Sequence, residues 1–158
     1  MEKSKKIDWK EYSRYCQLLA RRAKEEFDPQ LVVGIARGGV IAGATIASIL
    51  KRDFFPIKFS RKVSERVVRK KPKLVVPPTA ELSGKKILLV DDWSQSGETI
   101  KSALREIKKL KPEKIKTAVL VRRGDFEPDY YAMFSRQQII FPWEENLEEE
   151  REEMGLKK

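Results

Sequence analysis

One pattern constrains the fold of this chain more than any other: an apolar strand that leads at once into a helix. The run LVVGI (31–35) is continuously apolar, which is typical of a strand buried on both faces of a parallel sheet. A glycine-containing turn at 36–39 leads from it into a helix of small apolar residues. The run KILLV (86–90) repeats the pattern and precedes an amphipathic helix over 99–110. These repeated units predict an α/β fold with a mainly parallel twisted sheet flanked by helices, and further strands are expected at 54–59, 114–121 and 136–141.

The length of 158 residues indicates one domain spanning 1–158. We expect three parts within it, namely an amphipathic N-terminal helix, a core and an acidic C-terminal tail, at 8–27, about 31–143 and 144–158. In parallel α/β proteins the ligand lies at the carboxyl ends of the strands, so the residues that follow each strand are the first candidates for a site.

The composition excludes several kinds of chemistry. The chain has no histidine and a single cysteine, Cys16, which excludes histidine-based triads, histidine-ligated zinc and an internal disulfide. Any chemistry must therefore use carboxylates, cations, backbone amides or a metal bound by oxygen. No apolar run is long enough to span a membrane, and the start of the chain has no apolar signal segment, so we expect a cytoplasmic protein. The single asparagine, Asn146, and the surplus of Lys, Arg and Glu are a bias associated with thermophile proteins.

Charge is distributed unevenly along the chain. The net charge is +10, but 58–73 contains eight basic residues and one acidic residue, whereas 144–158 contains seven acidic and three basic residues. A basic segment of this density favours a polyanion, either a nucleic acid or a phosphorylated small molecule, and a solvated lysine-rich loop is the alternative. The valines of the basic segment indicate a hairpin or flexible flap inserted within the domain.

The most informative segment follows the strand at 86–90. The strand ends in two carboxylates, and the loop after them carries hydroxyl groups and a glycine before the helix begins, at Asp91, Asp92, Ser94, Ser96, Gly97 and Thr99. Free amides at a helix N-terminus beside hydroxyl groups form a cradle for a phosphate monoester. The two aspartates are suited to hold vicinal hydroxyl groups or Mg²⁺. The segment is neither a Walker loop nor a dinucleotide-binding motif, because it lacks the Gly-Lys-Ser/Thr ending and the GxGxxG spacing.

Three blocks of sequence resemble one known family. LLVDDWSQSGET resembles the phosphoribosyl-pyrophosphate signature of the type I phosphoribosyltransferases. VVGIARGGVIAGATIA resembles the pyrophosphate loop and following helix of that family, and PDYYAMFSRQQIIFPWE is similar to the closing segment of the bacterial xanthine-guanine phosphoribosyltransferases. The chain is therefore identified as a member of the type I phosphoribosyltransferase family, similar to its xanthine-guanine (6-oxopurine) enzymes. The resemblance implies the fold of that family, with a small hood and a flexible basic loop at 58–73.

The resemblance also implies roles for the two turns. The first turn would wrap the pyrophosphate and contain a cis peptide bond at Ala36–Arg37, and its residues are Ala36, Arg37, Gly38 and Gly39. Asp91 and Asp92 would bind the ribose hydroxyl groups, directly or through Mg²⁺. The second turn would hold the 5′-phosphate, and its residues are Ser94, Gln95, Ser96, Gly97, Glu98 and Thr99. The expected catalytic residues are Arg37, Asp91, Asp92 and Gln95, with the basic loop closing over them to exclude water.

The base-binding side departs from the family pattern. The position of a general base in 6-oxopurine enzymes is occupied by Gln95, whose amide takes up no proton near neutral pH, and this favours xanthine, the most acidic common 6-oxopurine. The resemblance places Arg122 at the 6-oxo group, or Arg123 after a one-residue shift, and Gln138 and Ile139 beside the base. Because Gln138 is not aromatic, the ring that stacks on the base is expected from elsewhere, with Phe134, Phe141 and Trp143 as candidates.

The implied activity is transfer of the phosphoribosyl group from phosphoribosyl pyrophosphate to xanthine, guanine or hypoxanthine, which yields the nucleoside 5′-monophosphate and pyrophosphate in purine salvage. Mg²⁺ is the implied cofactor, and a homo-oligomer, dimer or tetramer, is the implied assembly. One alternative is transfer to adenine or orotate, and another is a regulator that senses phosphoribosyl pyrophosphate and binds nucleic acid through its basic surface. The sequence has no helix-turn-helix pattern and no RNA-stacking aromatic motif, so nucleic acid is not the expected partner.

Overall fold

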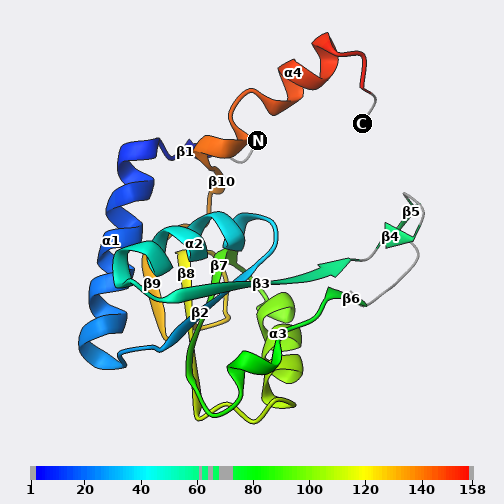
Figure 1. Ribbon diagram of the computed structural model, residues 1–158. Coiled ribbons are helices and arrows are strands. Elements are labelled where there is room, and N and C mark those ends of the chain that lie inside the picture. The colour runs from blue at the N-terminus through cyan, green and yellow to red at the C-terminus, as the bar shows by residue number, and fades with distance from the viewer. Residues whose placement is uncertain (1–2, 61, 64–65, 68–72, 157–158) are drawn as a thin grey trace.

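The computed structural model describes residues 3–60, 62–63, 66–67 and 73–156. Within this part of the chain the main sheet has six strands in the order β6-β3-β2-β7-β8-β9, all parallel except the edge strand β6 (Figure 1). In chain order the strands are β2 (Leu31–Ile35), β3 (Asp53–Ser60), β6 (Lys73–Val76), β7 (Lys86–Ser94), β8 (Lys114–Arg122) and β9 (Tyr130–Phe134). The predicted α/β fold with a mainly parallel sheet is confirmed.

Helices cover both faces of this sheet (Figure 1). α1 (Trp9–Glu26) and α2 (Gly38–Leu50) pack on one face, where Leu19 of α1 and Leu88 of β7 belong to one buried apolar cluster. α3 (Glu98–Lys108) covers the opposite face over a second apolar cluster. The sheet is therefore buried on both sides, which explains why its central strands are continuous apolar runs.

α2 approaches the sheet closely because it consists of small residues. A Cβ atom on Gly43 would lie 2.9 Å from the ring of Phe54 and 3.2 Å from the Cα of Gly34. Contacts this short leave no room for a larger side chain. The close packing fixes the first turn of α2, at Gly38, beside the end of β2.

A separate two-stranded sheet forms the hood. β1 (Ser4–Lys6) pairs in parallel with β10 (Gln138–Ile140). The chain then continues through the short helix η2 (Pro142–Glu144) into α4 (Leu147–Glu153). Figure 1 shows that α4 projects away from the body of the protein. The segment that follows β10 is therefore held at its start by β1 and is more exposed toward its end.

The basic segment 58–73 begins at the end of β3. Two short strands within it, β4 (Lys62–Val63) and β5 (Arg66–Val67), form an antiparallel hairpin, and the rest of the segment up to β6 lies outside the described residues. A short helix η1 (Ala80–Leu82) connects β6 to β7. The position of this insertion within the domain agrees with the sequence prediction.

Two strand predictions require correction. The strand predicted at 136–141 has only three residues and lies in the hood rather than in the main sheet. The edge of the main sheet opposite β6 is formed by β9, for which no strand was predicted. Tyr130 of β9 belongs to the apolar cluster on one face and Tyr131 packs against the cluster on the other. An edge strand covered on both faces lacks the alternation of polar and apolar residues that marks a strand in a sequence.

Candidate active site

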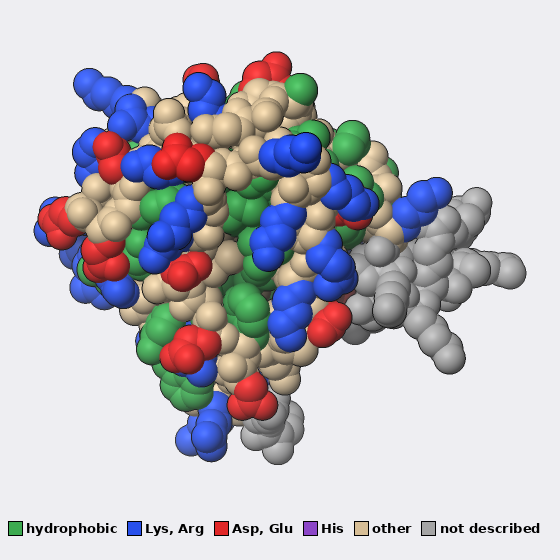
Figure 2. All heavy atoms as spheres, turned by 90° about the horizontal axis from the view of Figure 1, so that it is seen from below, with side chains coloured by type: hydrophobic (Ala, Val, Ile, Leu, Met, Phe, Trp, Pro, Cys, Tyr) green, Lys and Arg blue, Asp and Glu red, His purple; other side chains and the backbone are tan. Residues whose placement is uncertain are grey.

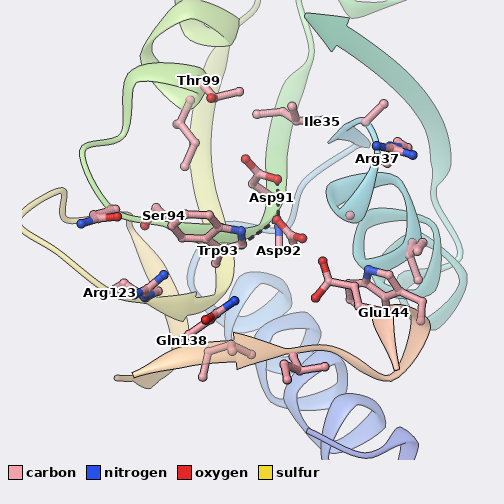
Figure 3. Close-up of a pocket in the computed structure, with 18 of the residues that line it drawn as sticks. Ile35, Arg37, Asp91, Asp92, Trp93, Ser94, Thr99, Arg123, Gln138 and Glu144 are labelled. Atoms are coloured by element: carbon pink, nitrogen blue, oxygen red, sulfur yellow. Dashed lines mark hydrogen bonds between the residues drawn. The ribbon is translucent and has the colours of Figure 1, made fainter. Parts of the chain in front are cut away.

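A cavity of about 1130 Å³ lies at the carboxyl ends of β2 and β7 (Figure 3). Because these two strands are neighbours in the parallel sheet, the turns that follow them meet at one edge. The cavity is lined by residues within the segments 35–41, 91–100 and 138–151, together with Arg123. It thus brings together the two predicted anion-binding turns and the segment that follows the hood strand.

Asp91 and Asp92 lie near the end of β7 and extend toward the cavity (Figure 3). The N–H of Asp92 donates to Asp91 Oδ1 at 2.9 Å, and the N–H of Trp93 donates to Asp92 Oδ1 at 2.9 Å. Burial raises the pKa of Asp91 well above its usual value, and the charge of Asp92 adds to this effect. Burial also raises the pKa of Asp92, to a smaller degree, and the charge of Glu144 contributes. In the described part of the chain neither carboxylate has a Lys or Arg partner.

An unpaired, buried carboxylate pair is suited to bind a divalent cation, because the cation stabilises both ionised groups. No cluster of three or more acidic, Cys or His side chains placed to hold a metal occurs among the described residues. Mg²⁺ typically binds one or two carboxylates and completes its coordination shell with water and phosphate oxygens. Asp91 and Asp92 therefore fit Mg²⁺ better than a metal that needs a full set of protein ligands.

The turn after β2 packs directly against this carboxylate pair. The peptide bond Ala36–Arg37 is cis, as the family resemblance implied. A Cβ atom on Gly38 would clash with the carboxylate of Asp92, and one on Gly39 would lie 2.6 Å from the backbone of β7. Glycine is thus required at both positions for this turn to pack against β7. The exposed Arg37 side chain has no hydrogen-bond or ion-pair partner in the described part of the chain and is available to an anion.

The loop after β7 presents hydrogen-bond donors to the cavity. Gly97 precedes α3 with a φ of 75°, and no side chain caps the helix. The N–H of Glu98 lies 3.4 Å from Ser96 Oγ, a long contact, so the first amides of α3 remain available. Ser94 is only 4% exposed, and its Oγ has no hydrogen-bond partner among the described residues. Free amides at a helix N-terminus together with hydroxyl groups bind anions.

The structure places Arg123, and not Arg122, in the cavity. Arg122 forms an ion pair with Glu127 at 3.1 Å and donates to the carbonyl of Gly124, so its guanidinium is directed away from the cavity. Arg122 is the last residue of β8 and Arg123 follows it, so of the two candidates from the sequence Arg123 is the one that lines the cavity. The Arg123 guanidinium lies 5.2 Å from the centre of the Trp93 ring, and its buried Nε has no partner among the described residues.

The aromatic ring nearest to the two turns is one that the sequence analysis missed. Trp93 is 39% exposed and lines the cavity between Asp92 and Arg123 (Figure 3). Of the rings considered from sequence, Phe141 is buried in the core and stacks on Trp143 with centroids 4.6 Å apart, Trp143 lines the cavity, and Phe134 does not. The available signal was a large aromatic residue inside an otherwise polar binding loop.

Two glutamines and a backbone segment complete this side of the cavity. Gln95 and Gln138 both line it, and their amides can donate or accept hydrogen bonds. Ile139 also lines the cavity but is 8% exposed, so its side chain belongs to the core and its backbone is the part available to a ligand.

The C-terminal segment contributes residues that the sequence analysis assigned to an acidic tail. Glu144 from η2, and Glu148 and Arg151 from α4, line the same cavity. The Oε2 of Glu144 accepts the N–H of Phe141 at 3.1 Å, and Arg151 pairs with Glu148 at 2.7 Å. No tail residue could be assigned to the site from composition alone, because a glutamate-rich helix is usually solvated.

The fold and the cavity together define a class of protein, namely an α/β protein with a carboxylate pair between two anion-binding turns. No helix in the described residues is long and apolar enough to cross a membrane. Residues 8–150 match the phosphoribosyl transferase domain family. Because this match covers most of the chain, the protein belongs to that family, as the sequence blocks indicated.

Relatives of known name agree with this assignment. The crystal structure of a purine phosphoribosyltransferase from Pyrococcus horikoshii is 31% identical in sequence, with a TM-score of 0.82 over 90% of this chain and 94% of that chain. An adenine phosphoribosyltransferase from Thermotoga petrophila is 32% identical over 122 residues, which are 73% of this chain and 69% of that protein. A xanthine-guanine phosphoribosyltransferase from Gluconobacter oxydans is 28% identical over 144 residues, 87% of this chain and 83% of that protein. Since these relatives are named for different bases, the base has to be argued from the residues of the cavity.

Proposed function

We propose that this protein transfers the phosphoribosyl group from phosphoribosyl pyrophosphate to a 6-oxopurine base in purine salvage. One observation carries the proposal: the carboxylates of Asp91 and Asp92 lie between two anion-binding turns in a single cavity. A ribose with a phosphate at one end and a pyrophosphate at the other matches this arrangement, because its hydroxyl groups lie between two anions.

The turn after β7 is assigned to the 5′-phosphate. The first amides of α3 and the hydroxyl groups of Ser94, Ser96 and Thr99 are donors at the positive end of a helix dipole. Binding at this end anchors the sugar without taking part in bond breaking. Its contribution is to hold C1 of the ribose at a fixed distance from the other turn.

The turn after β2 is assigned to the leaving group. The bond between C1 and the pyrophosphate oxygen breaks, the electron pair leaves with pyrophosphate, and C1 gains cationic character until a purine nitrogen bonds to it. The proton of that nitrogen is lost before the base binds, or it passes to water or to pyrophosphate, because the amide of Gln95 takes up no proton. Arg37 and the backbone amides of 36–39 stabilise the charge that develops on the leaving group. Asp91 and Asp92 accept hydrogen bonds from the ribose hydroxyl groups. Mg²⁺ held by these carboxylates supplies further positive charge at the pyrophosphate when bound.

The base is assigned to the space between Trp93, Arg123 and Gln138. A guanidinium group only donates hydrogen bonds, so Arg123 matches a carbonyl oxygen at position 6 of the purine and not the amino group of adenine. The Trp93 ring offers a surface on which a flat base can stack. Because Gln95 cannot accept a proton, a base that is already partly ionised, such as xanthine, requires the least help.

A pyrophosphate-release assay with phosphoribosyl pyrophosphate, Mg²⁺ and each of five bases tests the proposal. We expect turnover with xanthine, guanine and hypoxanthine, highest with xanthine, and little with adenine or orotate. Turnover with adenine alone would overturn the assignment of the base. Absence of turnover with every base, combined with nucleic-acid binding that weakens steeply with salt, would instead support the regulator.

A further inference from the structure

The proposed reaction has no role for the acidic C-terminal segment. Yet Glu144 and Glu148 line the cavity together with the turn that carries Arg37. In Figure 3 the Glu144 carboxylate extends into the cavity from the side opposite Asp91 and faces Asp92. An independent feature also marks the cavity as a ligand site: Ser94, which lines it, is 4% exposed, and its buried Oγ has no hydrogen-bond partner among the described residues.

The described lining of the cavity carries an excess of negative charge. It includes five carboxylates and three guanidinium groups, at Asp91, Asp92, Glu98, Glu144 and Glu148 and at Arg37, Arg123 and Arg151. The Arg151 guanidinium is already paired with Glu148 at 2.7 Å. A site for two phosphate groups would be expected to have the opposite balance, because like charges repel. Some of these carboxylates must therefore oppose the binding of the anionic ligand.

Glu144 is held in this position by the fold. Its Oε2 accepts the N–H of Phe141 at 3.1 Å, and the Phe141 ring is buried and stacked on Trp143. The pKa of Asp92 is raised mainly by burial, and the negative charge of Glu144 contributes to this rise. Neither Glu144 nor Glu148 has a role in holding the ribose or the base in the proposed reaction.

We propose that Glu144 and Glu148 weaken the binding of the pyrophosphate group on the Arg37 side of the cavity and thereby favour release of this product. The inference rests on the proposed function, because it assigns pyrophosphate to the turn that carries Arg37. The two glutamates act by electrostatic repulsion across the cavity, and Arg151 limits this repulsion by pairing with one of them. The acidic tail thus adjusts affinity for the anionic ligands without contacting the reacting atoms.

Titration calorimetry with inorganic pyrophosphate and Mg²⁺ tests the inference. The variant Glu144→Gln/Glu148→Gln removes two charges from the cavity while keeping an amide oxygen that can accept the N–H of Phe141. The matched control, Glu149→Gln/Glu152→Gln, removes two charges from positions of α4 that are exposed, as Glu144 and Glu148 are, but do not line the cavity. We expect the first variant to bind pyrophosphate about three- to tenfold more tightly. The control should stay within about twofold of the wild type, because its two carboxylates do not line the cavity, and water and salt screen them from a ligand bound there.

The outcomes separate this inference from the proposed function. Unchanged or weaker pyrophosphate binding in the cavity variant would overturn the inference while leaving the proposed function in place. An equal gain in the control would also overturn it, since the effect would then follow net charge and not position. If the wild type and both variants bind neither pyrophosphate nor phosphoribosyl pyrophosphate, the proposed function fails and the inference fails with it. Circular dichroism of each variant checks that the fold is retained.

Discussion

The two ends of the cavity are constructed in different ways. The phosphate side consists of two short turns, 36–39 and 94–99, whose main groups are backbone amides at helix N-termini and glycines that permit close approach. The side that we propose for the base consists of the side chains of Trp93 in β7, Arg123 just after β8 and Gln138 in β10. Anion binding by a backbone turn can be encoded in a short stretch of sequence, whereas selection of a base depends on how distant elements are arranged.

The comparison predicts that the largest losses of activity come from the carboxylate pair between the two turns of the phosphate side. Asp91→Asn and Asp92→Asn should each lower kcat/KM by about 10²–10³-fold, because the charge that faces the ribose and Mg²⁺ is lost while the shape is kept. Steady-state kinetics with xanthine measures the effect, and circular dichroism serves as the control for folding. Unchanged kcat/KM in both variants would contradict the phosphoribosyltransferase function itself.

A smaller but base-specific loss is expected at Arg123. Arg123→Ala should lower kcat/KM for 6-oxopurines by about 10–100-fold, the effect of losing a hydrogen bond from a charged donor, with little change in the affinity for pyrophosphate. The adjacent Arg122→Ala is the matched control, since Arg122 pairs with Glu127 outside the cavity. Equal losses in the two variants would mean that the distinction between the neighbouring arginines is wrong.

Trp93 tests whether the base side depends on a stacking ring. Trp93→Ala should raise the KM for the base by about tenfold, because aromatic contacts contribute on the order of 1 kcal/mol beyond the area that they bury. Phe134→Ala removes a ring that is 50% exposed and does not line the cavity, so it should leave the KM unchanged. The KM for xanthine and guanine is measured in both variants. A raised KM in Phe134→Ala alone would show that Phe134, and not Trp93, stacks on the base.

Gln95 lines the cavity, and its replacement should change the ratio of kcat/KM between two bases severalfold. Gln95→Asp introduces a carboxylate that can accept a proton, which should help hypoxanthine and guanine more than xanthine. The wild-type rate with xanthine should rise with pH as this base ionises, and the variant should flatten that dependence. The ratio of kcat/KM between bases is compared within each protein. An identical ratio in both would show that Gln95 does not face the base.

The smallest effect concerns stability. The folded-state pKa of Asp91 is raised above its usual 3.8 by burial and by the charge of Asp92, so the folded protein binds this proton more tightly than the unfolded chain does. The contribution of this proton to the free energy of unfolding is complete below the pKa of Asp91 in the unfolded chain. It is lost as the pH rises through the pKa of Asp91 in the folded protein. Without ligand, the Tm should therefore decrease over this range, and Asp91→Asn should raise the Tm at neutral pH by about 2–4 °C. The Tm of the wild type and of Asp91→Asn is measured by thermal unfolding from acid to neutral pH. The same Tm in both proteins at every pH would contradict this prediction.

The same difference between the two sides explains what the sequence could predict. The helix at 8–27 could be predicted from the sequence because the interactions that define it are local. Asp8 Oδ1 accepts the N–H of Glu11 at 2.7 Å, and apolar residues recur on one face. The turns at 36–39 and 94–99 could be predicted for the same reason. In both cases the residues that interact are neighbours in the chain.

The remaining features depend on contacts between distant residues. The register at Arg122 and Arg123 is set by the pairing of β7 with β8, in which Trp93 lies opposite Val121. Glu148 lines the cavity from α4, which follows the hood strand β10, and β10 is held in place by its pairing with the distant strand β1. No local pattern encodes either arrangement, so the sequence analysis placed Arg122 at the base and left Trp93 and the acidic residues outside the site.

The pairing of β1 with β10 also has a consequence for the order in which the protein is made. Residues 4–6 must wait for residues 138–140, which are synthesised near the end of the chain. The strands and helices that carry the phosphate side, from β2 to α3, are complete by Lys108. A nascent chain emerging from the ribosome therefore has the parts of its anion-binding half long before the hood is available. The part of the cavity that we propose to select the base is the last to be completed.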